Sequence, residues 1–208
     1  MSELSLERRP LPVGSIEIRS VGYWGMVGFV LTEASLCVYL EFSYYYYAVQ
    51  PHVGPWPPGG VPALRYALPA TIVLVVNAAA LAWAERAIVR GNVLVSNLAM
   101  ALALLLGLAF IALDGLEWES QTFTIGSSPY GSLFFGSEGI HMAHAVLGLL
   151  MLLPVLVWSL LGYFDRWRNT PIRVVALYWY FVDAAWLTVF FMIYLTPRLG
   201  LIWHGGAS

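Results

Sequence analysis

The chain has 208 residues, of which 60% are hydrophobic and 11% are charged, and its mean hydropathy is +0.73. This composition lies outside the range of soluble domains and indicates a single integral membrane domain. The net charge of −2, with ten arginines and no lysine, builds no basic surface and argues against nucleic acid as a partner. The single cysteine, Cys37, excludes an internal disulfide and a metal site built from several cysteines.

The first twenty residues combine charged side chains with two prolines and contain no apolar core segment. We therefore expect residues 1–20 to be a cytoplasmic tail and not a cleaved secretory signal. A membrane-spanning helix needs roughly 20 mostly apolar residues. Five segments meet this requirement: Val21–Tyr47, Tyr66–Val89, Val93–Leu116, Ser132–Leu161 and Val174–Leu195. Because they are too long and too continuously apolar for barrel strands, the predicted fold is all-α, an integral bundle of five transmembrane helices within residues 21–197.

Two polar segments, residues 50–62 and 119–131, are predicted to be loops because they are rich in turn-forming residues. With the N-terminus in the cytoplasm, the cytoplasmic segments contain eight arginines and the external segments two, in agreement with the positive-inside rule. The cytoplasmic set is Arg8, Arg9, Arg19, Arg86, Arg90, Arg166, Arg168 and Arg173, and the external pair is Arg65 and Arg198. The C-terminal tail, residues 198–208, is therefore predicted to be external. Glu85 beside Arg86 is interpreted as a pair of interfacial charges without assigned chemistry.

Ionisable side chains inside hydrocarbon are costly, so they usually face a protein interior. The buried polar candidates are Glu33, Asp114, Glu117, Glu138, His141, His144 and Asp183. Glu33 could tune the entry of protons or oxygen, or it could be a protonated carboxyl that is hydrogen-bonded between helices. Asp183 could be an acceptor that joins helices or the partner of an ion pair. We favour the structural interpretation for both residues.

The sharpest local pattern is formed by Glu138, His141 and His144, which recur at i, i+3 and i+6 and so lie along one edge of a helix. Two imidazoles and a carboxylate could bind zinc or iron, and Glu-x-x-His occurs in di-iron bundles. The chain has no second Glu-x-x-His. We therefore favour a hydrogen-bonded cluster that joins this helix to its neighbours, with Asp114 or Glu117 as partners, and keep the metal site as the alternative.

The histidine and cysteine content also limits redox chemistry. A haem-copper centre needs several histidines on different helices, and covalently attached haem needs Cys-x-x-Cys-His. The chain has four histidines, and two of them, His52 and His204, lie in a predicted loop and in the tail. It also lacks Gly-x-Ser-x-Gly and a glycine-rich phosphate loop. We expect no catalytic residue, and no cofactor or metal bound by this chain.

Three sequence blocks stand out in the last part of the chain. They are Tyr130-Gly131-Ser132-Leu133-Phe134-Phe135, then Gly139-Ile140-His141-Met142-Ala143-His144 with Gly148, then Tyr178-Trp179-Tyr180-Phe181-Val182-Asp183 with Trp186. Together they closely resemble the last two helices of subunit III of haem-copper oxidases, which use cytochrome c or quinol. Supporting matches are Thr32-Glu33, Trp56-Pro57-Pro58, and Glu117-Trp118 ahead of Phe123-Thr124-Ile125. The resemblance therefore extends from about Gly22 to Tyr194.

The resemblance implies a non-redox subunit III of a respiratory terminal oxidase, which reduces oxygen to water and pumps protons. It implies that haem and copper reside in the partner catalytic subunit, that subunits I and II are the partners, and that structural phospholipid is bound. The implied role is to stabilise the catalytic subunit and to support access of oxygen and protons. The chain resembles the short bacterial form of the family, so the implied location is a bacterial or archaeal cell membrane.

The sequence also departs from the family. Many members have two further helices ahead of this start, and the family usually has His at the position of Tyr180 and a neutral residue at Glu138 and Glu41. The accessory protein of nitric oxide reductases belongs to the same family and is the alternative. A stand-alone metalloprotein and a small transporter with Glu33 and Asp183 as proton carriers are further alternatives.

Overall fold

The computed structural model describes residues 21–50, 56–58 and 60–201. Its helices are α1 (Val21–Ala48), α2 (Ala67–Val89), α3 (Val93–Ser120), α4 (Pro129–Leu160) and α5 (Thr170–Phe190), and α5 continues into a π-helical turn, η1 (Phe191–Leu195), and α6 (Thr196–Arg198). No strand occurs in these ranges, and five helical segments are long and apolar enough to cross a membrane. The predicted all-α membrane fold is therefore confirmed.

The two predicted terminal tails lie mainly outside the residues that the structure describes. The predicted tail of residues 1–20 lies outside the described residues, as do residues 202–208 of the predicted C-terminal tail. His52 and His204 also lie outside them. The direction in which the chain crosses the membrane stays a prediction.

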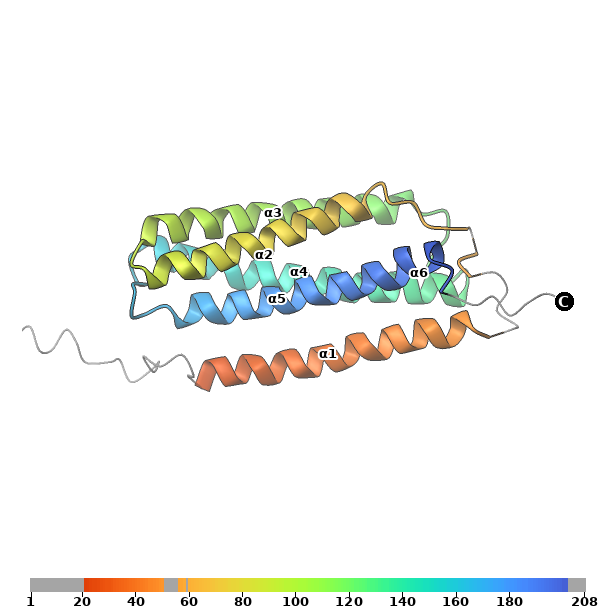
Figure 1. The fold of residues 1–208 in the computed structure, drawn as a ribbon, viewed down its shortest axis with the longest axis horizontal. Helices are drawn as coiled ribbons and strands as arrows, with labels where there is room; N and C mark the ends of the chain where they lie inside the picture. The colour runs from red at the N-terminus through yellow and green to blue at the C-terminus, as the bar shows by residue number, and fades with distance from the viewer. Residues whose placement is uncertain (1–20, 51–55, 59, 202–208) are drawn as a thin grey trace, which may run out of the picture.

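The helices form a four-helix bundle with one helix on its outside (Figure 1). In the bundle, α2 packs against α3 and α5, and α4 packs against the same two helices. Helix α1 lies beside the bundle, and one side of α1 packs against α4 and α5. In its most apolar stretch 0% of the residues are buried, compared with 39–56% in the other four spans. Most of the surface of α1 is thus available to lipid or to another chain.

A tight turn makes α2 and α3 antiparallel neighbours. Gly91 has φ +81°, a left-handed conformation that glycine adopts without steric cost. Asn92 then caps α3, because its side-chain oxygen accepts from the Val95 N–H at 3.1 Å. One turn further on, the Ser96 hydroxyl donates to the Ala84 carbonyl of α2 at 3.0 Å. The two helices are therefore joined by a buried hydrogen bond as well as by the turn.

Several helices extend beyond the predicted apolar spans. Helix α3 runs to Ser120 and not to Leu116, and α4 and α5 begin at Pro129 and Thr170. At the start of α4, the Ser128 hydroxyl accepts from the Gly131 N–H at 3.1 Å, and proline fits the first helical position because it lacks an N–H. Capping residues of this kind have no hydropathy signal, so the apolar pattern places them in loops.

Trp179 occupies the centre of the bundle, between two glycines. Its side chain is fully buried, and its indole N–H donates to the Gly148 carbonyl of α4 at 3.2 Å. A Cβ atom on Gly148 would lie 2.8 Å from the indole, and a Cβ atom on Gly107 of α3 would lie 2.9 Å from it. Only glycine leaves room for the ring at either position, which lets three helices approach closely.

We expect Gly148→Ala to lower the free energy of unfolding by about 1–3 kcal/mol, because the added methyl group overlaps the indole of Trp179. Thermal unfolding of the purified protein in mild detergent measures this change. Gly115→Ala in α3 is the matched control, since nothing lies within 4 Å of the added Cβ atom. The control should be neutral or slightly stabilising, and equal losses in the two variants would contradict the packing argument.

Candidate functional site

The buried polar residues of α4 lie on successive turns and contact different elements. Glu138, His141 and His144 are all buried, as the helical spacing predicts. Glu138 contacts the π-helical turn, His141 contacts the backbone of α5, and His144 contacts α1. Within the described ranges, no three His, Cys, Asp or Glu side chains form a group that could hold a metal ion. The geometry therefore distributes the three side chains among helix contacts.

Glu33 and His144 join α1 to the bundle. The His144 Nε2 atom lies 3.0 Å from the Glu33 Oε2 atom, close enough for a hydrogen bond between the two side chains. The ring of Phe181 packs edge-on against the imidazole at 5.5 Å between centroids. The Tyr178 hydroxyl donates to the backbone carbonyl of His144 at 3.1 Å. A carboxyl near the middle of α1 is therefore held against an imidazole that α5 positions.

His141 is enclosed by aromatic rings and bound to a backbone carbonyl. Its Nε2 atom lies 3.0 Å from the Val182 carbonyl oxygen, which can only accept, so Nε2 carries the proton. The rings of Phe110 and Trp186 lie 5.3 and 5.0 Å from the imidazole. The Trp186 indole in turn donates to the Thr71 hydroxyl of α2 at 2.9 Å. His141 thus sits where α2, α3, α4 and α5 meet, and its Nε2 atom is occupied.

At the end of the bundle opposite the α2–α3 turn, the carboxyl groups of Glu117 and Glu138 both contact the phenol of Tyr194. The Tyr194 hydroxyl lies 2.9 Å from Glu138 Oε1 and 3.2 Å from Glu117 Oε1. The Trp118 indole donates to Glu138 Oε2 at 3.0 Å, and the Gln121 amide donates to Glu117 Oε1 at 2.9 Å. The phenol has one proton, so the Tyr194 hydroxyl donates to one carboxyl at a time or shares its proton between the two.

Two of the expected polar contacts are absent. Neither carboxyl oxygen of Asp114 or of Asp183 has a hydrogen-bond partner among the described residues, although both side chains are buried. Of the two candidate partners for the polar edge of α4, Glu117 is linked to Glu138 through the Tyr194 hydroxyl, whereas Asp114 forms no hydrogen bond. Asp183 does not join helices as expected, since Tyr180, one turn away, donates to Glu85.

The motif residues at the start of α4 hold an aromatic cluster together. Trp56 is 1% exposed, and its ring lies 5.1 Å from the rings of both Tyr44 and Tyr130. These edge-on contacts fix the loop after α1 against α1 and α4. Gly131 is required beside this cluster, since a Cβ atom there would overlap the Thr124 carbonyl oxygen.

Two further motif residues contact the end of α3 and the segment that follows it. The Ser132 hydroxyl donates to the Ile125 carbonyl at 2.6 Å. A Cβ atom on Gly139 would lie 3.5 Å from the Trp118 ring, so the indole lies directly over this glycine. Like Trp179, Phe181 and Trp186, these motif residues lie where neighbouring segments pack closely.

The sequence did not identify Tyr194 as part of the site. This residue lies in the π-helical turn η1, where the extra residue per turn alters the direction of the side chains that follow α5. Hydropathy gives no signal for such a turn. The detectable signal was a single phenol in an otherwise apolar stretch at the same end of the bundle as Glu117 and Glu138.

We expect Tyr194→Phe to lower the free energy of unfolding by about 1–2 kcal/mol, because two buried carboxyls lose the hydroxyl between them. The ring itself and its stacking on Phe190 are retained. The thermal midpoint in mild detergent is the measurement. Tyr39→Phe on α1, where the side chain is 66% exposed, is the control and should leave the midpoint unchanged. An equal midpoint for both variants would show that the shared hydroxyl does not stabilise the protein.

Known proteins resemble this chain over most of its length. Residues 15–197 match the family model of Cytochrome c oxidase subunit III. Cytochrome c oxidase subunit 3 of Arabidopsis thaliana is 30% identical over 212 residues, which cover 99% of this chain and 76% of the relative. The protein of the same name in Petromyzon marinus is 34% identical over 179 residues, or 82% of this chain and 68% of the relative. These relatives are eukaryotic, so they do not support the expected bacterial or archaeal origin.

Proposed function

Because the chain belongs to the cytochrome c oxidase subunit III family, we propose that it serves a terminal oxidase complex as a non-redox support for the subunits that hold haem and copper. Its partners in this proposal are subunits I and II of the oxidase. It stabilises the catalytic subunit, binds structural phospholipid and supports the access of oxygen and protons. The complex lies in an energy-converting membrane, in agreement with the five segments able to span one.

The observation that carries the proposal is that buried polar side chains of the family motifs contact neighbouring helices. Each of these side chains that has a partner binds a neighbouring element: His144 contacts Glu33 of α1, His141 contacts the α5 backbone, and Trp186 contacts α2. Within the described ranges, the Nδ1 atoms of His141 and His144 have no hydrogen-bond partner, but no three His, Cys, Asp or Glu side chains come together as a metal site would require. Polar contacts that join neighbouring helices therefore support a structural role for this chain beside subunits that hold the redox centres.

The position of α1 supports the lipid and partner roles. This helix contacts the bundle through α4 and α5, and its most apolar stretch has no buried residue. An extended apolar helix face in a membrane protein is covered by acyl chains or by a neighbouring helix. Residues such as Trp24, Tyr39 and Phe42 are more than half exposed on α1 and provide such a face.

Affinity purification of the tagged chain from its native membrane tests the proposal. We expect haem-bearing subunits to copurify in mild detergent and to give a reduced-minus-oxidised spectrum, because the redox centres belong to the partners. A complex assembled without this chain should keep that spectrum but lose activity during sustained turnover. Absence of a haem-bearing partner would refute the proposal. Copurification with a nitric oxide reductase, identified by nitric oxide consumption, would replace the oxidase with the alternative complex.

A further inference from the structure

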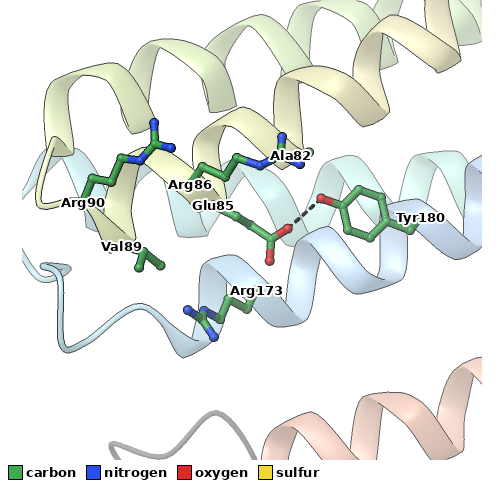
Figure 2. Close-up of a pocket in the computed structure, with 7 residues that line it drawn as sticks. All are labelled: Ala82, Glu85, Arg86, Val89, Arg90, Arg173 and Tyr180. Carbon is green, nitrogen blue, oxygen red and sulfur yellow. Dashed lines mark hydrogen bonds between the residues drawn. The ribbon is translucent and has the colours of Figure 1, made fainter.

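A pocket of about 330 Å³ opens at the end of the bundle where α2 finishes and α5 starts (Figure 2). It is lined by Ala82, Glu85, Arg86, Val89, Arg90, Arg173 and Tyr180. Figure 2 shows Glu85 between the arginines of α2 and Arg173 of α5. The pocket is separate from the buried polar contacts of α4 and contains none of their residues.

The pocket has more positive charge than its own residues neutralise. Three arginines and one carboxylate line it, which leaves two positive charges in excess. The Glu85 carboxylate accepts from the Tyr180 hydroxyl at 2.6 Å and lies within electrostatic reach of Arg86 and Arg173. Among the described residues, none of the three guanidinium groups has a salt bridge within 4.0 Å or a side-chain hydrogen bond, and the side chains of Arg86 and Arg90 are exposed. An anion would complete the pocket.

The position of Arg173 points to the same conclusion. It lies in the first turn of α5, where the partial positive charge of the helix N-terminus disfavours a cation. Arg86, in the last turn of α2, is at the favourable end of its helix. The residue before α5, Asn169, makes no side-chain capping bond to the N–H groups of that turn. An anion in the pocket would offset the unfavourable charge and would also face a helix N-terminus.

The shape of the pocket distinguishes a lipid from a free ion. Along α2 it extends from Arg90 at the helix end to Ala82, about 12 Å deeper by the rise of an α-helix. Its mouth is therefore charged, and its inner part is lined by alanine and a tyrosine ring. A phosphodiester suits the mouth, since guanidinium groups bind phosphate oxygens in pairs, and a glycerol backbone with the first acyl carbons suits the inner part.

We infer that this pocket binds the phosphate group of an anionic phospholipid, held by Arg86, Arg90 and Arg173. Basic pockets between transmembrane helices at the cytoplasmic side bind anionic headgroups, and the arginine distribution predicts this end of the bundle to be cytoplasmic. The inference rests on the lipid-binding part of the proposed function and assigns that binding to this pocket. It does not depend on which oxidase or reductase the chain accompanies.

Titration of the purified, delipidated complex with short-chain phosphatidylglycerol tests the inference, with the thermal midpoint as the measurement. We expect phosphatidylglycerol to raise the midpoint, and phosphatidylcholine and inorganic phosphate to have much smaller effects. Arg90→Gln should weaken the apparent affinity about five-fold, the factor that corresponds to roughly 1 kcal/mol for each basic residue. Arg86→Gln with Arg173→Gln should weaken it by about 25-fold, as two such losses combined.

Arg166→Gln is the matched control. Arg166 lies in the loop between α4 and α5 at the same end of the bundle, stacks on Trp167 at 4.8 Å and does not line the pocket. This variant should keep the wild-type affinity. Equal weakening by the control would overturn the site, as would an unchanged affinity in Arg90→Gln, whose exposed side chain is not needed for folding.

The other arms of the titration separate the possible ligands. An equal response to inorganic phosphate would overturn the lipid and leave a phosphate site, and an equal response to phosphatidylcholine would overturn the need for an anionic headgroup. The haem spectrum of each preparation is recorded alongside. Absence of a lipid response in the wild-type complex with an intact haem spectrum refutes the pocket alone, whereas a lipid response in a wild-type chain without a haem partner refutes the oxidase assignment alone.

Discussion

The fold depends on the absence of water from the bilayer interior, which requires polar side chains to find partners within the protein or to remain unsatisfied at a cost. This chain satisfies part of its buried polar side chains by contacts between distant segments and leaves Asp114 and Asp183 without hydrogen-bond partners among the described residues. Glu33 is paired with His144, more than a hundred positions away, and Tyr194 stands between two carboxyls. Because these contacts join different helices, each one also fixes how the helices are arranged.

Much of the fold could be predicted from hydropathy, because a 30 Å apolar layer imposes a minimum length on every span. The helix ends could not, since capping residues such as Ser128 act through single hydrogen bonds that hydropathy does not detect. The helical period placed Glu138, His141 and His144 on one edge but did not identify their partners. Partners depend on how neighbouring helices rotate and where they begin, which local sequence does not encode.

The sequence blocks that carry the family resemblance correspond to contacts between helices in the structure. The blocks contain glycines beside large aromatic residues, and in the bundle these pairs are contacts between helices. Trp118 lies over Gly139, and Trp179 lies against Gly148. Tyr180 and Glu138, which the resemblance predicts to differ from the usual family residues, each form a hydrogen bond to a residue in another helical segment. Both side chains thus belong to the polar contacts between helices.

The arrangement of Trp179 between Gly107 and Gly148 has a consequence for sequence divergence. The volume at this point is fixed by three positions on three helices, so the size of one side chain limits the sizes of the other two. A smaller residue at position 179 would leave a cavity that a larger residue at position 107 or 148 could fill. Relatives that have lost the indole should therefore have gained volume at one of the glycines, and the three positions should vary together.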